Sequence, residues 1–132
     1  MTARTWLYGK IASTPGVDQR VFAKKTMTSS IEQHPFMVYK FGNNTNEELA
    51  EDVDASRQFV QIYIHDYADK ETGDYTKIDE IIRWLKQNLR NQSSAEDGVL
   101  TTIYLETSQD LDDDTLNTVM KYVRFQLVLK ET

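Results

Sequence analysis

The side chains best suited to acid–base chemistry in this 132-residue chain are its two histidines, His34 and His65. A catalytic histidine is normally oriented by a carboxylate. Asp66 directly follows His65, but neighbouring residues of a strand point to opposite faces of a sheet, so the two do not form an oriented pair. His34 precedes a proline at the start of a predicted strand. We therefore expect sheet or surface positions for both histidines.

The acidic run near the C-terminus raises the question of a metal site. Asp110, Asp112 and Asp114 match the opening of a calcium loop. Such a loop needs glycine at its sixth position and glutamate at its twelfth, where this chain has Thr115 and Lys121. The pattern instead predicts a solvated turn or the start of a helix over 112–114, and no metal.

Other catalytic and cofactor signatures are missing from the sequence. The chain has no cysteine, and its five glycines are too far apart to form a phosphate-binding loop. No serine lies in a strand–turn–helix setting, and no basic face flanks the strands as specific nucleic-acid binding requires. The apolar runs are too short to span a membrane. We expect a soluble single domain over 1–132 that is not an enzyme and needs no cofactor.

The N-terminal half predicts one short helix and a pair of strands. Residues 2–13 have helical spacing, and Pro15-Gly16 ends that helix. A short extended piece is expected at 20–22. Strands are expected at 34–42 and 58–65, the second with strict alternation, and the two should pair in antiparallel fashion. Their connection, 42–57, is predicted to be a long acidic loop, with a helical turn as an alternative for 47–55.

The C-terminal half predicts the main helix and two further strands. A helix over 75–91, capped by Asp74 or Thr76, carries one apolar stripe that consists of Ile78, Ile81, Ile82, Leu85 and Leu89. Trp84 lies off this stripe, so it either packs beneath the N-terminal segment or anchors a protein interface. Strands are expected at 99–105 and 119–130, joined by an acidic connection over 106–118.

The element order β-β-α-β-β predicts an α+β fold, in which an antiparallel sheet of about four strands has the main helix on one face and a short N-terminal helix in front. The uncovered face would be mixed in character and would carry Tyr63, His65, Tyr104, Tyr122 and Arg124. Such a face beside unpaired sheet edges favours contact with a neighbouring molecule.

The net charge of −6 is unevenly distributed along the chain. Residues 1–42 have six basic and two acidic side chains, and the remaining ninety have nine basic and nineteen acidic ones. Two stretches, 43–56 and 105–115, contain acid and no base. Opposite charges on two regions suit head-to-tail assembly, although a solvated acidic surface kept for solubility is the plainer alternative.

The order and character of the segments resemble those of the tail terminator (tail completion) proteins of long-tailed bacteriophages. The matching segments follow a short N-terminal helix and span about 20–130. They are Arg20-Val21-Phe22, Pro35-Phe36-Met37-Val38-Tyr39, an acidic loop leading to Arg57 and the alternating strand up to Ile64, the amphipathic helix, a strand, an acidic turn and the long final strand.

This resemblance implies a structural virion protein that forms a ring, usually of six copies, on the head-proximal end of the tail tube. The ring would stop tube polymerisation and offer a docking surface to the head connector, and genomic DNA would pass through it without sequence-specific binding. The protein would reside in the host cytoplasm until assembly. The alternatives are a head-side neck or connector ring protein and a small non-viral adaptor domain.

Two groups of residues are the candidates for these roles. The interface candidates are Arg57, Tyr63, Trp84, Tyr122 and Arg124. Acidic side chains would line the lumen and repel the DNA backbone, and the candidates for this role are Glu47, Glu48, Glu51, Asp52, Asp110, Asp112, Asp113 and Asp114.

Overall fold

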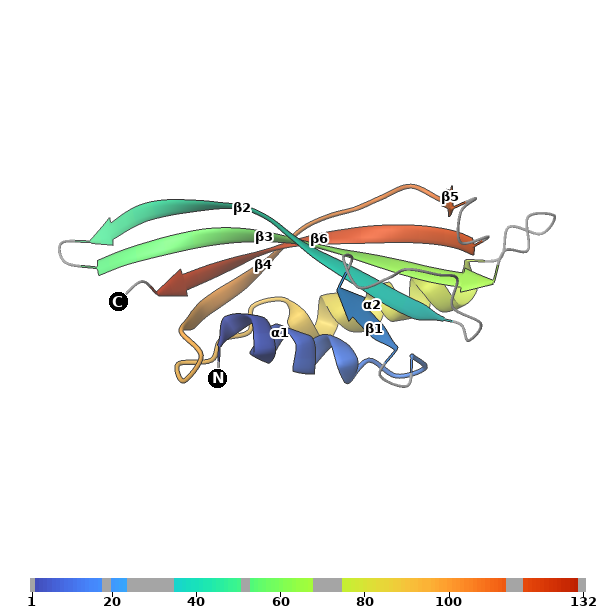
Figure 1. Ribbon diagram of the computed structural model, residues 1–132, viewed down its shortest axis with the longest axis horizontal. Helices are drawn as coiled ribbons and strands as arrows, with labels where there is room; N and C mark the ends of the chain where they lie inside the picture. Colours follow the sequence, from blue (N-terminus) through green and yellow to red (C-terminus); the bar gives the residue numbers. More distant parts are fainter. Residues whose placement is uncertain are drawn as a thin grey trace.

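A computed structural model describes residues 2–17, 20–23, 35–50, 53–67, 75–113 and 118–130 (Figure 1). Two helices, α1 (Ala3–Ala12) and α2 (Thr76–Leu89), cover one face of a six-stranded sheet. Its strands are β1 (Val21–Ala23), β2 (Phe36–Ala50), β3 (Val53–Tyr67), β4 (Val99–Thr107), β5 (Leu111–Asp113) and β6 (Thr118–Lys130). The mixed α+β architecture agrees with the sequence prediction.

The strand order is β1-β2-β3-β6-β4, and β5 pairs with β6. The β1–β2 pair is parallel and the other pairs are antiparallel. The prediction of about four strands is therefore wrong by two. Both additional strands, β1 and β5, have only three residues, too few to show an alternating pattern. The extended piece predicted at 20–22 corresponds to β1.

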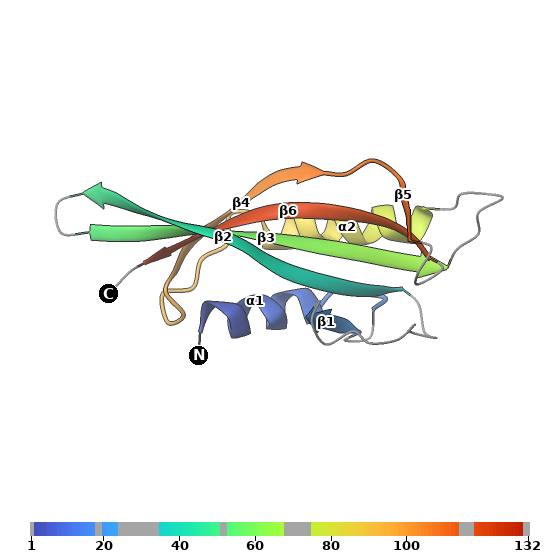
Figure 2. The ribbon, with the colours of Figure 1, turned by 45° about the horizontal axis from the view of Figure 1, so that its top comes forward.

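The core lies between the helices and one face of the sheet. The apolar stripe of α2 is buried, and Leu7 and Ile11 of α1 join it. The sheet contributes alternate residues from the middle of β3 and β6 to this core, namely Val60, Ile62, Ile64, Val123, Phe125 and Leu127. Figure 2 shows α1 and α2 beside the middle and right-hand part of the sheet. None of the helices in the described ranges is long and apolar enough to cross a membrane.

The helix termini differ in how they are capped. Thr2 caps α1, because its hydroxyl accepts a hydrogen bond from the Thr5 backbone N–H. Tyr75 holds the corresponding position of α2 and makes no side-chain cap. Thr76 is therefore the first residue within the helix, and the prediction that it caps the helix is wrong. Asp74 lies outside the described residues.

The predicted acidic loop over 42–57 is a β-hairpin. β2 continues to Ala50 and β3 starts at Val53, so most of this stretch is paired strand. The neighbouring strand offers backbone partners to a segment whose own residues have little β propensity. The acidic connection at 106–118 is also partly strand, because β4 reaches Thr107 and β5 follows at Leu111–Asp113. The predicted turn or helix start at 112–114 is wrong over 112–113, and Asp114 lies outside the described residues.

Candidate interaction surface

The face of the sheet turned away from the helices, hereafter the open face, is built from cross-strand rows. Tyr39 and Phe41 pack against the core, so the side chain of Lys40 between them belongs to the open face. Lys40 pairs with Gln61, and Gln61 pairs with Arg124. The neighbouring row consists of Val38, Tyr63 and Tyr122. The open face thus combines cations with aromatic rings.

Four of the five interface candidates lie on this face. Arg57 and Tyr63 come from β3, and Tyr122 and Arg124 come from β6. The Tyr63 and Tyr122 rings pack with their centroids 5.8 Å apart. Their roles as interface residues stay predictions, but the fold brings these four residues onto one surface. That juxtaposition follows from the strict alternation of the two strands, which the sequence displays directly.

Tyr104 is not on the open face, contrary to the expectation. Its ring packs against Phe125 with the centroids 5.7 Å apart, and Lys86 of α2 lies over it. The pairing register of β4 against β6 shifts between Val99 and Thr101. An irregularity of this kind exchanges the faces of the residues that follow, so simple alternation from Val99 assigns Tyr104 to the wrong side.

The two arginines of the open face are held by neighbouring polar groups. Arg124 Nη1 lies 2.8 Å from Glu106 Oε1, and both side chains are exposed to solvent by two-fifths or more. The hydrogen bond from Arg124 to Glu106 raises the pKa of Arg124 above its usual value. Arg57 Nη1 donates to Gln126 Oε1 at 3.1 Å. These contacts orient each guanidinium and leave that of Arg124 accessible.

A hollow of about 250 Å³ opens on this face where β2 bulges. The register shift between Phe41 and Asn44 gives β2 one residue more than β3. The guanidinium of Arg124 lies 5.9 Å from the Phe59 ring centroid. Lys40 and Phe59 are not among the residues predicted from the sequence, although both alternate with core residues. The hollow is lined by Lys40, Gly42, Phe59, Val60, Gln61 and Arg124.

The opposite end of the open face buries an aromatic stack. His65 is 3% exposed and its ring stacks on Phe36, with centroids 4.8 Å apart and planes within 4°. Asp66 pairs with Val119 of the core, so it belongs to the other face. The expected sheet position of His65, on the side opposite Asp66, is confirmed. His34 lies outside the described residues.

The acidic candidates divide between two regions. Glu47 and Glu48 are strand residues of β2, while Glu51 and Asp52 lie outside the described residues. Asp112 and Asp113 belong to β5. Asp110 precedes β5 and forms an ion pair with Lys121 at 3.1 Å. The four residues Glu47, Glu48, Asp112 and Asp113 thus lie in strands and not in loops. Their position in a lumen stays a prediction.

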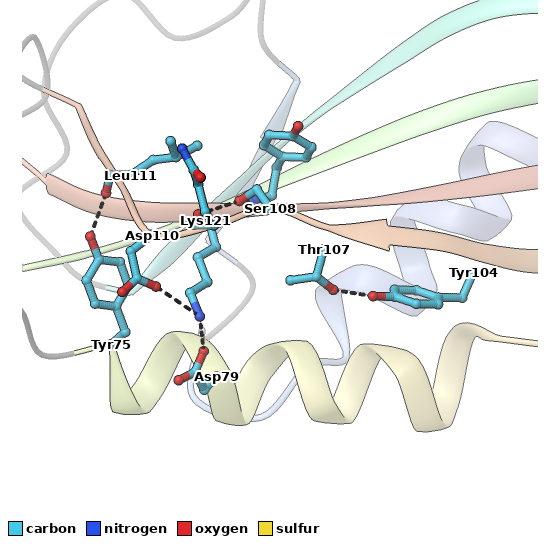
Figure 3. A network of polar contacts seen from close by, with 10 residues as sticks. Tyr75, Asp79, Tyr104, Thr107, Ser108, Asp110, Leu111 and Lys121 are labelled. Atoms are coloured by element: carbon cyan, nitrogen blue, oxygen red, sulfur yellow. Dashed lines mark hydrogen bonds and ion pairs between the residues drawn. The ribbon is translucent and has the colours of Figure 1, made fainter.

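Lys121 links the β4–β5 connection to α2 through ion pairs (Figure 3). Its Nζ lies 2.7 Å from Asp79 Oδ1 as well as close to Asp110, and the hydrogen bond to Asp79 raises the pKa of Lys121. Tyr75 Oη donates to the Leu111 carbonyl at 2.8 Å. Desolvation, followed by the nearby Asp112 and Asp110, raises the pKa of Tyr75. This network positions the acidic segment against the helix.

Trp84 lies away from the open face, on α2. It packs against the core and is half-buried. With Pro15, Gly16 and Arg20 it lines a cleft of about 450 Å³ between α2 and the N-terminal segment. Trp84 therefore lies beside that segment, across the cleft, and both of its expected roles, packing against the segment and anchoring an interface, stay predictions.

Comparison with known proteins gives a fold likeness. No family model and no curated protein matches the chain. Among solved structures, it is similar to a chain from "Virion of native gene transfer agent (GTA) particle", with a TM-score of 0.61 and 9% sequence identity. The likeness covers 92% of this chain and 84% of the other. The chain therefore shares its fold, over nearly its whole length, with a chain found in a virion.

Proposed function

We propose that this chain is a structural subunit of a virion and that it acts as a tail terminator. In this role it forms a ring, of six copies, on the head-proximal end of the tail tube. The ring stops tube polymerisation and presents a docking surface to the head connector. The observation that carries the virion assignment is the fold shared with a chain of a virion over 92% of this sequence. The segment order that resembles tail terminators supports the more specific role.

The open face supports assembly by repeated contacts. It combines aromatic rings with basic side chains. Aromatic residues and arginine are enriched at protein interfaces. The two helices do not cover this face, because they lie on the other side of the sheet (Figure 2). A contact between this face and a different surface of the next copy is heterologous, and heterologous contacts close into rings when the rotation between subunits divides a full turn.

The acidic segment at 106–113 suits a channel for DNA. Glu106, Asp110 and Asp112 are exposed or partly exposed and the segment contains no base. Carboxylates that face a passing phosphate backbone repel it, so the DNA slides without sequence-specific binding. Finding this segment on the outer rim of the ring would exclude that role.

The direct test is imaging of the purified chain mixed with purified tail tubes, together with native mass measurement. A tail terminator gives a six-fold cap on one end of each tube. The same chain is then mixed with head connector complexes that lack tubes. Binding to the connector and not to the tube would favour the neck or connector ring instead. A chain that stays monomeric and binds neither would contradict the virion assignment.

A further inference from the structure

The β2–β3 hairpin extends beyond the rest of the sheet, at the end drawn on the left of Figure 1. The last pairing of β3 with β6 is Ala55↔Lys130. Beyond it, residues 47–50 of β2 and 53–54 of β3, hereafter the arm, pair only with the hairpin itself among the described residues. A two-stranded ribbon is at best marginally stable in water, and its edges are templates for pairing. The arm therefore favours contact with another molecule.

The charge of the arm specifies the chemistry of that contact. Its six residues include Glu47, Glu48 and Asp54 and no basic residue. Glu48 and Asp54 are direct cross-strand partners. A segment with three acidic residues and no basic one is attracted to a cationic surface. Leu49 and Val53 supply apolar side chains to the same short segment.

The open face offers the complementary chemistry. Lys40 is exposed and shares the rim of the hollow with Arg124, and Phe59 provides an apolar lining. An arginine has five donors, so Arg124 can bind another carboxylate while it retains Glu106. The hollow is lined by residues of β2 and β3, and the arm continues outward from there along the same two strands, so it cannot reach the hollow of its own chain. The hollow that it can reach belongs to a second copy.

We propose that the acidic arm of one copy docks on the open face of the next, with its carboxylates beside Lys40 and Arg124. This inference rests on the proposed ring and names the contact that builds it. Each copy uses its arm on one side and its open face on the other, which is a heterologous contact. The arm carboxylates then lie between subunits together with Glu106, and the lumen role passes to Asp110 and Asp112.

The test uses two charge reversals of the full chain. One variant reverses the arm through Glu47→Lys and Glu48→Lys, and the other reverses the face through Lys40→Glu and Arg124→Glu. In each variant alone, arm and face carry like charge, so ring formation should fall about tenfold or more. In an equimolar mixture, each arm meets an oppositely charged face, and rings of alternating subunits should form. Native mass distinguishes these mixed rings, which must contain an even number of copies.

Matched controls carry the same charge changes elsewhere. Glu80→Lys with Glu96→Lys alters exposed carboxylates away from the arm, and Arg83→Glu with Arg90→Glu alters exposed arginines away from the open face. Both controls should assemble as the unmodified chain does. Thermal melting of each variant verifies folding. If an arm reversal unfolds the chain, the milder Glu47→Gln with Glu48→Gln should still weaken assembly and reduce its dependence on salt.

The outcomes separate this inference from the proposed function. If the unmodified chain forms rings and the arm variants assemble equally well, the arm contact is wrong and the ring stands. If each reversal blocks assembly but the mixture does not restore it, direct pairing of arm and face is wrong. If the unmodified chain forms no ring with or without tail tubes, both proposals fail.

Discussion

The two faces of one sheet use the same strands for different purposes. On the helix-covered face, β3 and β6 present Val60, Ile62, Val123 and Phe125, all of which are buried. On the open face, the residues between them include Gln61, Tyr63, Tyr122 and Arg124, which remain partly exposed. The difference shows that one alternating pattern can specify both a core and a surface for association. Substitutions on the first face should affect folding, and substitutions on the second should affect assembly.

The largest effect on stability is expected from Phe125→Ala. Phe125 is fully buried and packs against Tyr104, so its truncation leaves a cavity and should lower the free energy of unfolding by about 3–5 kcal/mol. Tyr122→Ala, on the open face of the same strand, should cost less than half as much. Urea unfolding of both variants measures the difference. Equal losses would break the distinction between the two faces.

A smaller loss is expected from Trp84→Ala. This side chain is half-buried beside the N-terminal segment, so its removal should cost about 2 kcal/mol. Arg83→Ala, an exposed neighbour on α2, is the control and should change stability by less than about 0.5 kcal/mol. Thermal unfolding and ring assembly are measured together. Unchanged melting with weakened assembly would assign Trp84 to an interface, and no change in either would exclude both roles.

The substitution Lys121→Met should lower the free energy of unfolding by only about 1 kcal/mol, because the carboxylate partners of Lys121 are more than half exposed. The Lys121 network also makes a pH prediction. Folding raises the pKa of Lys121 above 10.5 and that of Tyr75 above 10.0. The stabilisation is therefore complete below these unfolded-state values and is lost as pH rises through the folded-state values. Unfolding measured from below to above pH 10.5 should show a steeper alkaline decline in the unmodified chain than in Lys121→Met.

The smallest effect on stability, and the clearest on assembly, is expected from Arg57→Glu combined with Arg124→Glu. Both residues lie on the open face and make polar contacts near the surface, so the melting temperature should change little. Reversal of two open-face charges should nevertheless weaken ring assembly strongly. Sedimentation compares the assembly of this variant with that of the control variant, which combines Arg83→Glu with Arg90→Glu. Normal assembly of the open-face variant would show that these arginines do not contribute to the contact.

Much of the fold follows from periodicity. The helical stripe of α2 and the alternation in β3 and β6 predict those elements and place Arg57, Tyr63, Tyr122 and Arg124 together. The sequence does not predict the hairpin, because Gly42, Asn43 and Asn44 are typical of a turn. In the structure β3 pairs with the chain beyond them. The misplacement of Tyr104 has a similar cause, a register shift that leaves no mark in the residue pattern. Pairing partners distant in sequence decide both cases.

The bulge at Gly42 has a geometric consequence for any ring built through the arm. A β-bulge bends its strand and increases the local twist, and this one lies between the body and the arm. Because β2 has one residue more than β3 there, the bulge changes the direction of the arm and also exchanges the faces of the β2 residues beyond it relative to simple alternation. The angle at which successive copies meet decides how many of them close a circle. Subunit number would then be encoded in the curvature of a single strand, separately from the residues that determine how tightly the copies bind.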